Sequence, residues 1–222
     1  MNNYQIKVLA ATLMLGDHIA YIFQNHEINR YLFSLHLIGR LSFPLFAWLL
    51  VQGESHTRNF WLYLSRLLIL GVISQSIYTN VSNSTSLNIL FTLSLALICL
   101  RMERLKPKLQ ILFWLPAIIF AEGAGLEYGA YGIVLVYLVK LITTSSSWLI
   151  GVGLWIGLHI LYLWQMISND TGDLAQFLAI FAPLIFKLTN YQQGRKTYFF
   201  YIFYPLHLFI LFLVKISLKL EV

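Results

Sequence analysis

Charged side chains are scarce in this chain, and their scarcity indicates its solvent. Only 11% of the 222 residues are Asp, Glu, Lys or Arg, whereas 59% are hydrophobic. A soluble domain carries about 25% charged residues, so this chain lacks the polar groups needed to coat a globule. The mean hydropathy is +0.72, and the apolar runs are continuous instead of alternating with polar residues as in a β-barrel. The composition therefore predicts an all-α bundle of membrane-spanning helices.

Cysteine is almost absent as well. Cys99 stands alone, which excludes an internal disulfide and a cysteine-based metal cluster. We expect no metal cofactor. The net charge of +6 comes from basic residues between the apolar runs, which is a topology signal. We therefore expect the lipid bilayer, and not a nucleic acid, as the partner of this basic chain.

The hydropathy pattern predicts nine to ten transmembrane helices in a single domain, residues 1–222. About 20 apolar residues cross a bilayer, and we place spans at 6–23, 31–52, 60–78, 87–100, 109–121, 130–143, 148–166, 174–188 and 197–218. A tenth span would bring Lys215 and Lys219 to the cytoplasmic side.

Basic residues predict the orientation. With the N-terminus in the cytoplasm, the outer loops hold only Arg30 as a basic residue, together with acids such as Asp173. The cytoplasmic loops then hold Arg58, Arg101, Arg104, Lys106, Lys108, Lys140, Lys187, Arg195 and Lys196. This distribution follows the positive-inside rule, and it predicts a multi-pass protein of the bacterial cytoplasmic (inner) membrane.

Ionisable side chains within the spans are the candidate functional groups. Asp17 and His18 are adjacent in the first span, Arg40 lies in the second, Arg66 in the third and His207 in the last. A charge at the centre of a span costs about 2.5–3.5 kcal/mol, so these groups face a bundle interior or a wet cavity. A structural ion pair, such as Asp17 with Arg40 or Arg66, is one interpretation. The excess of bases over acids at depth favours a functional site.

Helical geometry places Lys7 and His18 on one stripe. Ten residues separate them, so eleven steps of 100° return to nearly the same face, roughly 16 Å further along the axis. Lys7 is then at the cytoplasmic mouth and His18 lies near mid-membrane. A neutral imidazole there can accept a proton, and Asp17 can orient it or raise its basicity.

Further polar residues gather near both predicted membrane surfaces. His36 and Arg40 are one turn apart, and Pro44 can kink their helix. Arg58 and Arg66 at the cytoplasmic opening suit a phosphate-bearing ligand, although topology alone also explains Arg58.

The outer side offers its own candidates. Three glycines in GLEYGAYG (125–132) permit close backbone approach, and Glu127 within it can hold a cationic amine. A plain loop-to-helix junction is the alternative. Tyr204 and His207 are three residues apart and can face one cavity, although His207 can also be a packed core histidine.

Several stretches, taken in order, resemble the TraX family of membrane proteins, whose named member acetylates the N-terminus of F-type conjugative pilin. They cover most of the chain: IKVLAATLMLGDHIAYIF, LIGRLSFPLFAWLLVQG, TRNFWLYLSRLLIL, LNILFTLSLAL, EYGAYGIVL and FFYIFYPLHLFIL. That family is similar to the acyltransferase-3 group, whose first helix carries an arginine, ten residues and a catalytic histidine. Lys7 stands in place of the arginine, and His18 matches the histidine.

The resemblance implies an acetyl-CoA-dependent acyltransferase with the donor on the cytoplasmic side and the acceptor outside. We expect His18 to be the general base, Asp17 to orient it and Arg40 to stabilise the oxyanion. Contacts to the CoA phosphates are expected from Lys7, Arg58 and Arg66, and contacts to the acceptor from Glu127, Tyr204 and His207. The acceptor is a pilin-like N-terminal amine or a hydroxyl of an envelope glycan or lipid. A proton-coupled transporter and a non-catalytic assembly protein are the rival hypotheses.

Overall fold

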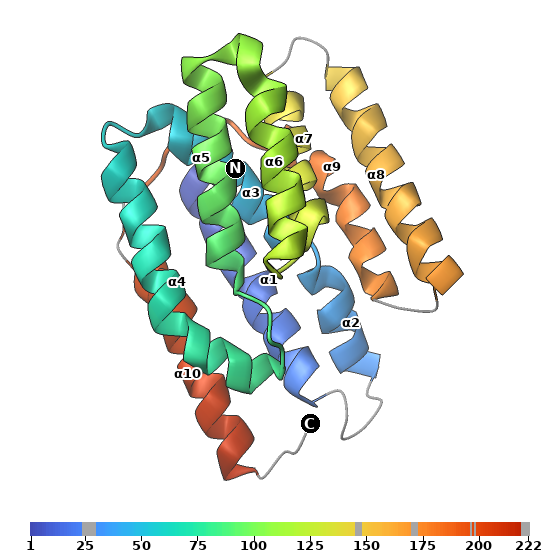
Figure 1. The fold of residues 1–222 in the computed structure, drawn as a ribbon. Coiled ribbons are helices and arrows are strands. Elements are labelled where there is room, and N and C mark those ends of the chain that lie inside the picture. Colours follow the sequence, from blue (N-terminus) through green and yellow to red (C-terminus); the bar gives the residue numbers. More distant parts are fainter. Residues whose placement is uncertain (24–29, 145–147, 170–172, 196, 198, 219–222) are drawn as a thin grey trace. The chain divides into compact units, whose positions relative to one another are not determined.

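The structure of this protein is a computed structural model that describes residues 1–23, 30–144, 148–169, 173–195, 197 and 199–218. Over these residues the chain is helical, and its one β-type pairing is an isolated bridge between Leu87 and Leu126 (Figure 1). The α-helices are α1 (Asn3–Phe23), α2 (Arg30–Gly39), α3 (Ser42–His56), α4 (Phe60–Ser82), α5 (Ile89–Leu105), α6 (Gln110–Gly123), α7 (Gly129–Thr144), α8 (Trp148–Asn169), α9 (Ala182–Lys187) and α10 (Phe199–Ser217). Two 3-10 helices, η1 (Pro107–Leu109) and η2 (Leu174–Phe181), complete the set, and the predicted all-α class is confirmed.

In the part of the chain that the structure describes, five helical segments are long and apolar enough to cross a membrane: α1, α2 together with α3, α4, α8 and α10. The predicted spans at 130–143 and 174–188 correspond to shorter apolar helices, α7 and η2–α9. Those at 87–100 and 109–121 correspond to α5, with 17 residues, and α6, with 14. A 14-residue helix is only about 21 Å long, against about 30 Å of hydrocarbon. The count of nine to ten spans is therefore not confirmed.

The second predicted span is broken. Helix α2 ends at Gly39 and α3 begins at Ser42, and Arg40 lies in the turn between them. Short i→i−3 bonds, Arg40 N to Leu37 O at 3.3 Å and Leu41 N to Ile38 O at 3.2 Å, carry the chain through this turn. Pro44 does not kink a continuous helix, because it lies in the first turn of α3, where its missing N–H leaves no bond unmade.

The chain forms two compact units. Unit 1 comprises residues 1–49 and 138–196, and unit 2 comprises 50–137 and 197–222. Two of the three boundaries fall inside α3 and α7, and the third lies between α9 and α10, so each unit joins segments that are distant in the sequence. The prediction of one domain stays a prediction.

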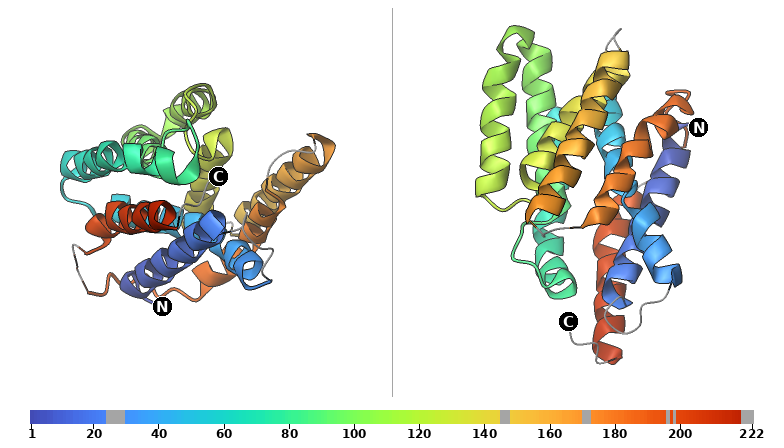
Figure 2. Two further views of the ribbon diagram at one scale, coloured as in Figure 1. Left: turned by 90° about the horizontal axis from the view of Figure 1, so that it is seen from below. Right: turned by 90° about the vertical axis from the view of Figure 1, so that its right-hand side faces the viewer.

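In unit 1, α1 packs on α2, α2 contacts η2, and η2 packs on α8. Figure 2 shows α2 alongside α1 near the end where α1 finishes. The start of α1 is tied to the segment after α9, because Asn3 N donates to Gln192 O at 2.8 Å and Asn190 N donates to Met1 O at 2.9 Å. The start of α1 and the end of α9 therefore lie at one end of the unit. With the N-terminus inside, this end is cytoplasmic.

In unit 2, α10 packs on α4, α4 on α5, and α5 on α6. The guanidinium of Arg66 lies 5.3 Å from the centroid of the Tyr201 ring, and Lys215 Nζ donates to Asn80 O at 2.8 Å. Helices α4 and α10 therefore run in the same direction. Lys215 therefore lies at the end of α4, where it caps the last carbonyls of that helix. Lys196 and Lys219 lie outside the described residues.

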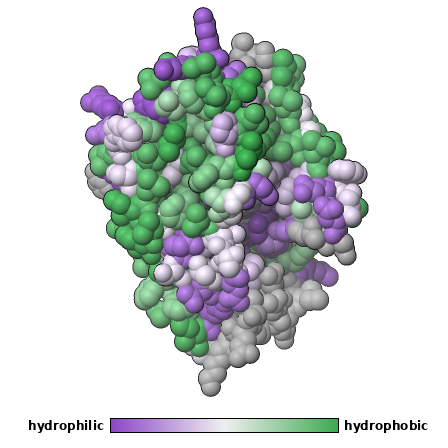
Figure 3. All heavy atoms as spheres, in the orientation of Figure 1, coloured by the Kyte–Doolittle hydropathy of each residue, from purple (hydrophilic) through white to green (hydrophobic). Residues whose placement is uncertain are grey.

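The lipid-facing character of unit 2 is visible on its surface. Apolar side chains cover the face formed by α4, α5 and α6 (Figure 3). Exposed large residues on these helices include Trp61, Val72, Ile111 and Ile119. Such a continuous apolar surface suits contact with lipid.

The α5–α6 hairpin is closed by a buried hydrogen bond of 2.9 Å that Trp114 Nε1 donates to Glu103 Oε2.

Candidate functional site

A charged network in unit 1 joins α1, α2, the α2–α3 turn and the start of η2. Arg40 NH2 donates to Asp17 Oδ1 at 2.9 Å, and its Nε lies 3.2 Å from Asp173 Oδ2. His36 lies between the same two acids, with Nδ1 2.9 Å from Asp17 Oδ1 and Nε2 2.9 Å from Asp173 Oδ2. We call these residues, Asp17, His36, Arg40 and Asp173, the charged network. The predicted pairing of Asp17 with Arg40 is present in it.

The protonation of His36 follows from its two neighbours. Both ring nitrogens lie at hydrogen-bond distance from carboxylate oxygens, which accept but do not donate when ionised. The two carboxylates favour protons on both nitrogens and hence an imidazolium ring, whereas Arg40 NH2, 3.1 Å from Nδ1, disfavours the proton on that nitrogen. We take the ring as an imidazolium because two anions face it and one cation does. The charged network then holds two cations and two anions, and its net charge is zero. Such compensation is what allows several charges to be placed at depth.

Asp173 is predicted from the sequence only as an acid of an outer loop. It caps η2, where its Oδ1 accepts from Ala175 N at 2.9 Å, and its other oxygen remains available to the charged network. Burial raises the pKa of this carboxyl, but the bond from His36 and the charge of Arg40 outweigh burial, so its pKa lies below the ordinary value. A sequence signal existed, because an Asp directly before an apolar run is typical of a helix start.

Gly39 sets the distance between α1 and α2. A Cβ atom built on Gly39 would lie 2.5 Å from Asp17 Cβ, closer than any real contact. Glycine at the end of α2 therefore allows the backbone of α2 to approach Asp17 closely. This approach brings Arg40, the next residue, within bonding distance of Asp17.

His18, the predicted base, is half-buried in α1 and lies within electrostatic range of Asp17 and Arg40. It is fifteen residues after the start of α1, about 22 Å along the axis. The predicted mid-membrane position of His18 stays a prediction. Lys7 is half-buried near the cytoplasmic end of α1. The roles of His18, Asp17, Arg40 and Lys7 stay predictions.

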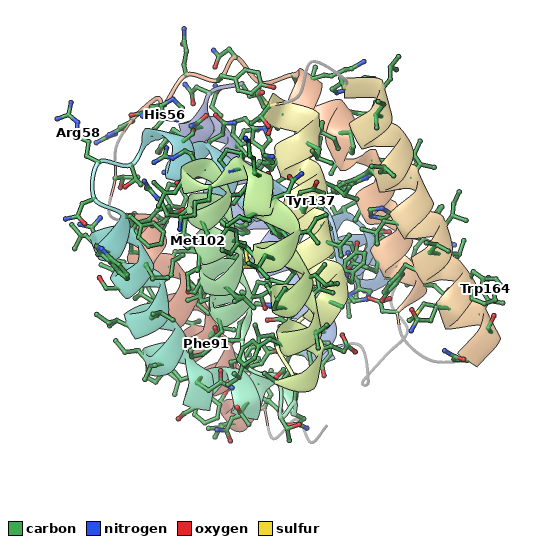
Figure 4. All side chains as sticks on the ribbon, turned by 45° about the horizontal axis from the view of Figure 1, so that its top comes forward. His56, Arg58, Phe91, Met102, Tyr137 and Trp164 are labelled. Atoms are coloured by element: carbon green, nitrogen blue, oxygen red, sulfur yellow. The ribbon has the colours of Figure 1, made fainter. Side chains whose placement is uncertain are left out.

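The other predicted phosphate ligands belong to unit 2. Arg58 is exposed at the turn between α3 and α4, beside His56, and its side chain extends away from the helices (Figure 4). Arg66 lies over the Tyr201 ring. Asn59, between them in sequence, caps α4 by accepting from Leu62 N at 3.0 Å.

Sequence analysis missed a second charged group in unit 2. The buried carboxylate of Glu54 lies 2.9 Å from Arg101 Nε and 3.4 Å from Arg104 Nε. The guanidinium of Arg101 also lies 4.8 Å from the centroid of the Phe60 ring. These arginines were read only as topology anchors. A glutamate directly after an apolar span was the available signal.

The three predicted acceptor residues gather in unit 2. The backbone of Glu127 is fixed by a bond from its N to Leu87 O of 2.8 Å and one from Thr92 Oγ1 to its O of 2.7 Å. Tyr204 is buried within electrostatic range of Glu127. His207 is buried too, with its ring centroid 5.6 Å from that of Tyr204. The structure thus places Tyr204 near both other candidates.

His207 also fits its alternative as a packed histidine. Its Nδ1 lies 2.7 Å from Phe203 O, and its ring stacks on the Phe203 ring at 15°. Across the described ranges, no group of three or more His, Cys, Asp or Glu side chains is arranged to hold a metal ion.

Two comparisons with known proteins give matches over nearly the whole chain. The profile of the family described as TraX protein matches residues 2–215. A relative from Dichelobacter nodosus, described as "Probable fimbrial assembly protein FimC, serogroup H1", is 31% identical over 242 aligned residues. These cover 97% of this chain and 96% of the relative. No solved structure shows a significant match.

Proposed function

This chain belongs to the TraX family, and from that membership and the ionisable groups of unit 1 we propose that it is an acetyltransferase of the bacterial cytoplasmic membrane. It moves an acetyl group from cytoplasmic acetyl-CoA to an acceptor on the outer side. A pilin-like N-terminal amine is the favoured acceptor, because the D. nodosus relative is described as a fimbrial assembly protein. The observation that carries the proposal is His18 within electrostatic range of Asp17 and Arg40 inside apolar helices.

The proposed reaction is direct transfer. The lone pair of a neutral acceptor amine attacks the thioester carbonyl carbon, and the carbonyl π electrons move to oxygen. His18 takes the proton that the amine nitrogen releases, and Arg40 stabilises the oxyanion. When the intermediate collapses, the C–S bond breaks and the thiolate of CoA receives that proton from His18. A two-step route through an acetyl-histidine forms and breaks the same bonds in another order.

The charges of the candidate binding residues are opposite to those of the two substrates. Lys7, Arg58 and Arg66 offer cations for the phosphates of CoA, Arg as a fork and Lys as a point charge. On the acceptor side, Glu127 offers a carboxylate and Tyr204 a ring face, a combination that attracts an ammonium group before deprotonation. His207 is the third acceptor candidate. A hydroxyl acceptor on a glycan or lipid is uncharged, so the carboxylate of Glu127 would attract it less than an ammonium group.

The test is transfer of a labelled acetyl group by the full-length protein in detergent. Wild type is expected to label a peptide with a free pilin-type N-terminus, but not the same peptide with a blocked N-terminus. His18→Ala should remove the activity, whereas His56→Ala, at an exposed histidine that ends α3, serves as the matched control and should retain it. Labelling of an envelope glycan in place of the peptide would shift the assignment to O-acetylation. If wild type neither binds nor consumes acetyl-CoA, the proposed function is wrong.

A further inference from the structure

One carboxylate oxygen in unit 1 lies against two cationic nitrogens. Oδ2 of Asp173 is 2.9 Å from His36 Nε2 and 3.2 Å from Arg40 Nε. The two nitrogens come from different parts of the chain, the last turn of α2 and the turn that follows it. His36 Nε2 is at hydrogen-bond distance from this oxygen and Arg40 Nε at ion-pair distance. Two cationic groups thus face one negatively charged oxygen, and acyl-transfer enzymes likewise place donors and positive charge around the oxyanion of a tetrahedral intermediate.

The two donors are held from the opposite side by another acid. Oδ1 of Asp17 accepts from Arg40 NH2 at 2.9 Å and lies 2.9 Å from His36 Nδ1. Asp17 thus contacts the nitrogens of His36 and Arg40 that Asp173 does not contact. It keeps His36 protonated at both nitrogens, so the Nε2 proton remains available on the Asp173 side.

The two acids differ in how easily they can leave. The side chain of Asp17 is 11% exposed, whereas that of Asp173 is 38% exposed, the highest value in the charged network. Asp17 sits in the middle of a long helix, against the backbone of Gly39. Asp173 is the cap residue before η2, and rotation about its side-chain bonds can turn its carboxylate to solvent at the cost of the cap bond from Ala175 N. Asp17 is therefore the fixed acid and Asp173 the removable one.

We propose that His36 Nε2 and Arg40 Nε form the oxyanion site for the acetyl transfer proposed above, and that the carboxylate of Asp173 occupies this site until the thioester displaces it. This inference rests on the proposed function. It adds His36 as a catalytic residue, Asp17 as the positioning residue of both donors, and Asp173 as an internal competitor of the substrate.

Charge balance supports the exchange. With Asp173 in place, two cations face two anions. When the amine attacks, the π electrons of the carbonyl give its oxygen one negative charge, and this oxygen replaces the Asp173 carboxylate beside the same two nitrogens. Once the neutral thioester carbonyl has displaced Asp173, the buried group carries one net positive charge, and the oxyanion formed by the attack neutralises it, while the proton taken up by His18 adds a positive charge beside it. No proton moves to the oxyanion, and collapse returns its electron pair to the carbonyl as the C–S bond breaks.

The predicted base lies in the same part of unit 1. His18 is the residue after Asp17 and is within electrostatic range of Arg40. A thioester whose oxygen is bound by His36 and Arg40 would therefore have its carbonyl carbon in the neighbourhood of His18. General-base attack further requires the His18 ring within hydrogen-bond reach of the attacking amine.

The first experiment tests the site without any activity. In Asp173→Ala the two donors lose their bound oxygen, so the melting temperature of the detergent-purified full chain should fall. Sodium formate should then restore it with saturation, beyond sodium chloride at equal ionic strength, because formate offers the missing carboxylate. Wild type and the double variant Asp173→Ala/Arg40→Met should not respond in this way. The control is Glu122→Ala, which removes another capping carboxylate, the one that accepts from Ala130 N, and should show no formate effect.

The second experiment tests the use of the site in catalysis. His36→Ala and Arg40→Met should each lower kcat for acetyl transfer by about 10²–10³-fold, with KM for acetyl-CoA changed far less. Asp173→Ala should instead lower that KM severalfold by removing the competitor, with a much smaller effect on kcat. A network that is only structural predicts that all three variants lose activity together.

The outcomes separate the two proposals. Absence of a saturable formate effect in Asp173→Ala, or an equal effect in the double variant, refutes the two-donor site. A kcat in Asp173→Ala as low as in His36→Ala refutes its role as an oxyanion site with an internal competitor. If wild type transfers no acetyl group at all, the proposed function and the catalytic use of the site are both wrong, whereas the formate result still decides whether the anion site exists.

Discussion

The substitution Gly39→Ala tests how the charged network is assembled. The added Cβ atom would lie 2.5 Å from Asp17 Cβ and 3.0 Å from Asp17 Cα. Carbon atoms pack at about 3.5–4.0 Å, so α2 has to move by about 1 Å from α1. A shift of this size along the Arg40–Asp17 bond would stretch it from 2.9 Å beyond hydrogen-bond distance.

Its cost can be worked out from two contributions. Forcing an extra methyl group into a packed contact costs about 1–3 kcal/mol, and weakening a hydrogen bond to a charged group adds up to about 1.5–3 kcal/mol. A total of about 1–6 kcal/mol corresponds to a fall in melting temperature of roughly 2–24 °C for a chain of this size. Because Arg40 loses its position, the rate of acetyl transfer by Gly39→Ala should fall together with the melting temperature.

The chain offers a matched control on the same pair of helices. A Cβ atom on Gly16 would meet Leu35 Cδ2 at 3.4 Å, an ordinary contact, and one on Gly157 of α8 would meet nothing within 4 Å. Gly16→Ala and Gly157→Ala should therefore melt within about 1 °C of wild type or slightly above it, since alanine favours helices. The assay is thermal unfolding in detergent at fixed protein and detergent concentration. A Gly39→Ala protein as stable as these controls would refute the close approach of α1 and α2.

Three further predictions concern charge. The pKa of Asp173 is depressed in the folded protein, so its stabilisation is complete above its unfolded pKa of about 3.9. It is lost as the pH falls through the lower folded value, and Asp173→Asn should remove this part of the acid dependence of the melting temperature. Lys215→Met should destabilise by about 0.3–2 kcal/mol because α4 loses its C-terminal cation, whereas Lys108→Met, at an exposed lysine of η1, should not. Glu54→Gln should destabilise by about 3–5 kcal/mol, because Arg101 loses its partner; equal melting of variant and wild type would contradict this.

The candidate residues were found from sequence by one argument, that an ionisable side chain in an apolar span is expensive. This argument selected Asp17 and Arg40, which the structure joins. It gave no role to His36, although that residue was placed one turn from Arg40. It missed Asp173, because loop acids carry no such cost and are common. Counting only residues within the predicted spans gave an excess of bases over acids. The carboxylate that balances this excess belongs to Asp173, which lies outside those spans.

The sequence also misplaced the interruption of the second span. Pro44 was the obvious helix breaker, but a proline in a first turn disturbs nothing. The chain instead turns at Arg40, between α2 and α3. This position depends on the contact of Gly39 with Asp17 in another helix, and such a contact has no signature in the local pattern.

The sequence alone determined the solvent of this protein, its helical class and its family. These depend on composition, on the periodicity of short segments and on the order of residues along the chain, all of which act locally. Only the tertiary structure decided which charges meet. Asp17, His36, Arg40 and Asp173 come from four places in the sequence, and their pairing exists because α1, α2 and η2 pack together in unit 1. The strength of an ion pair depends on the distance between its atoms, and that distance is a property of the packing.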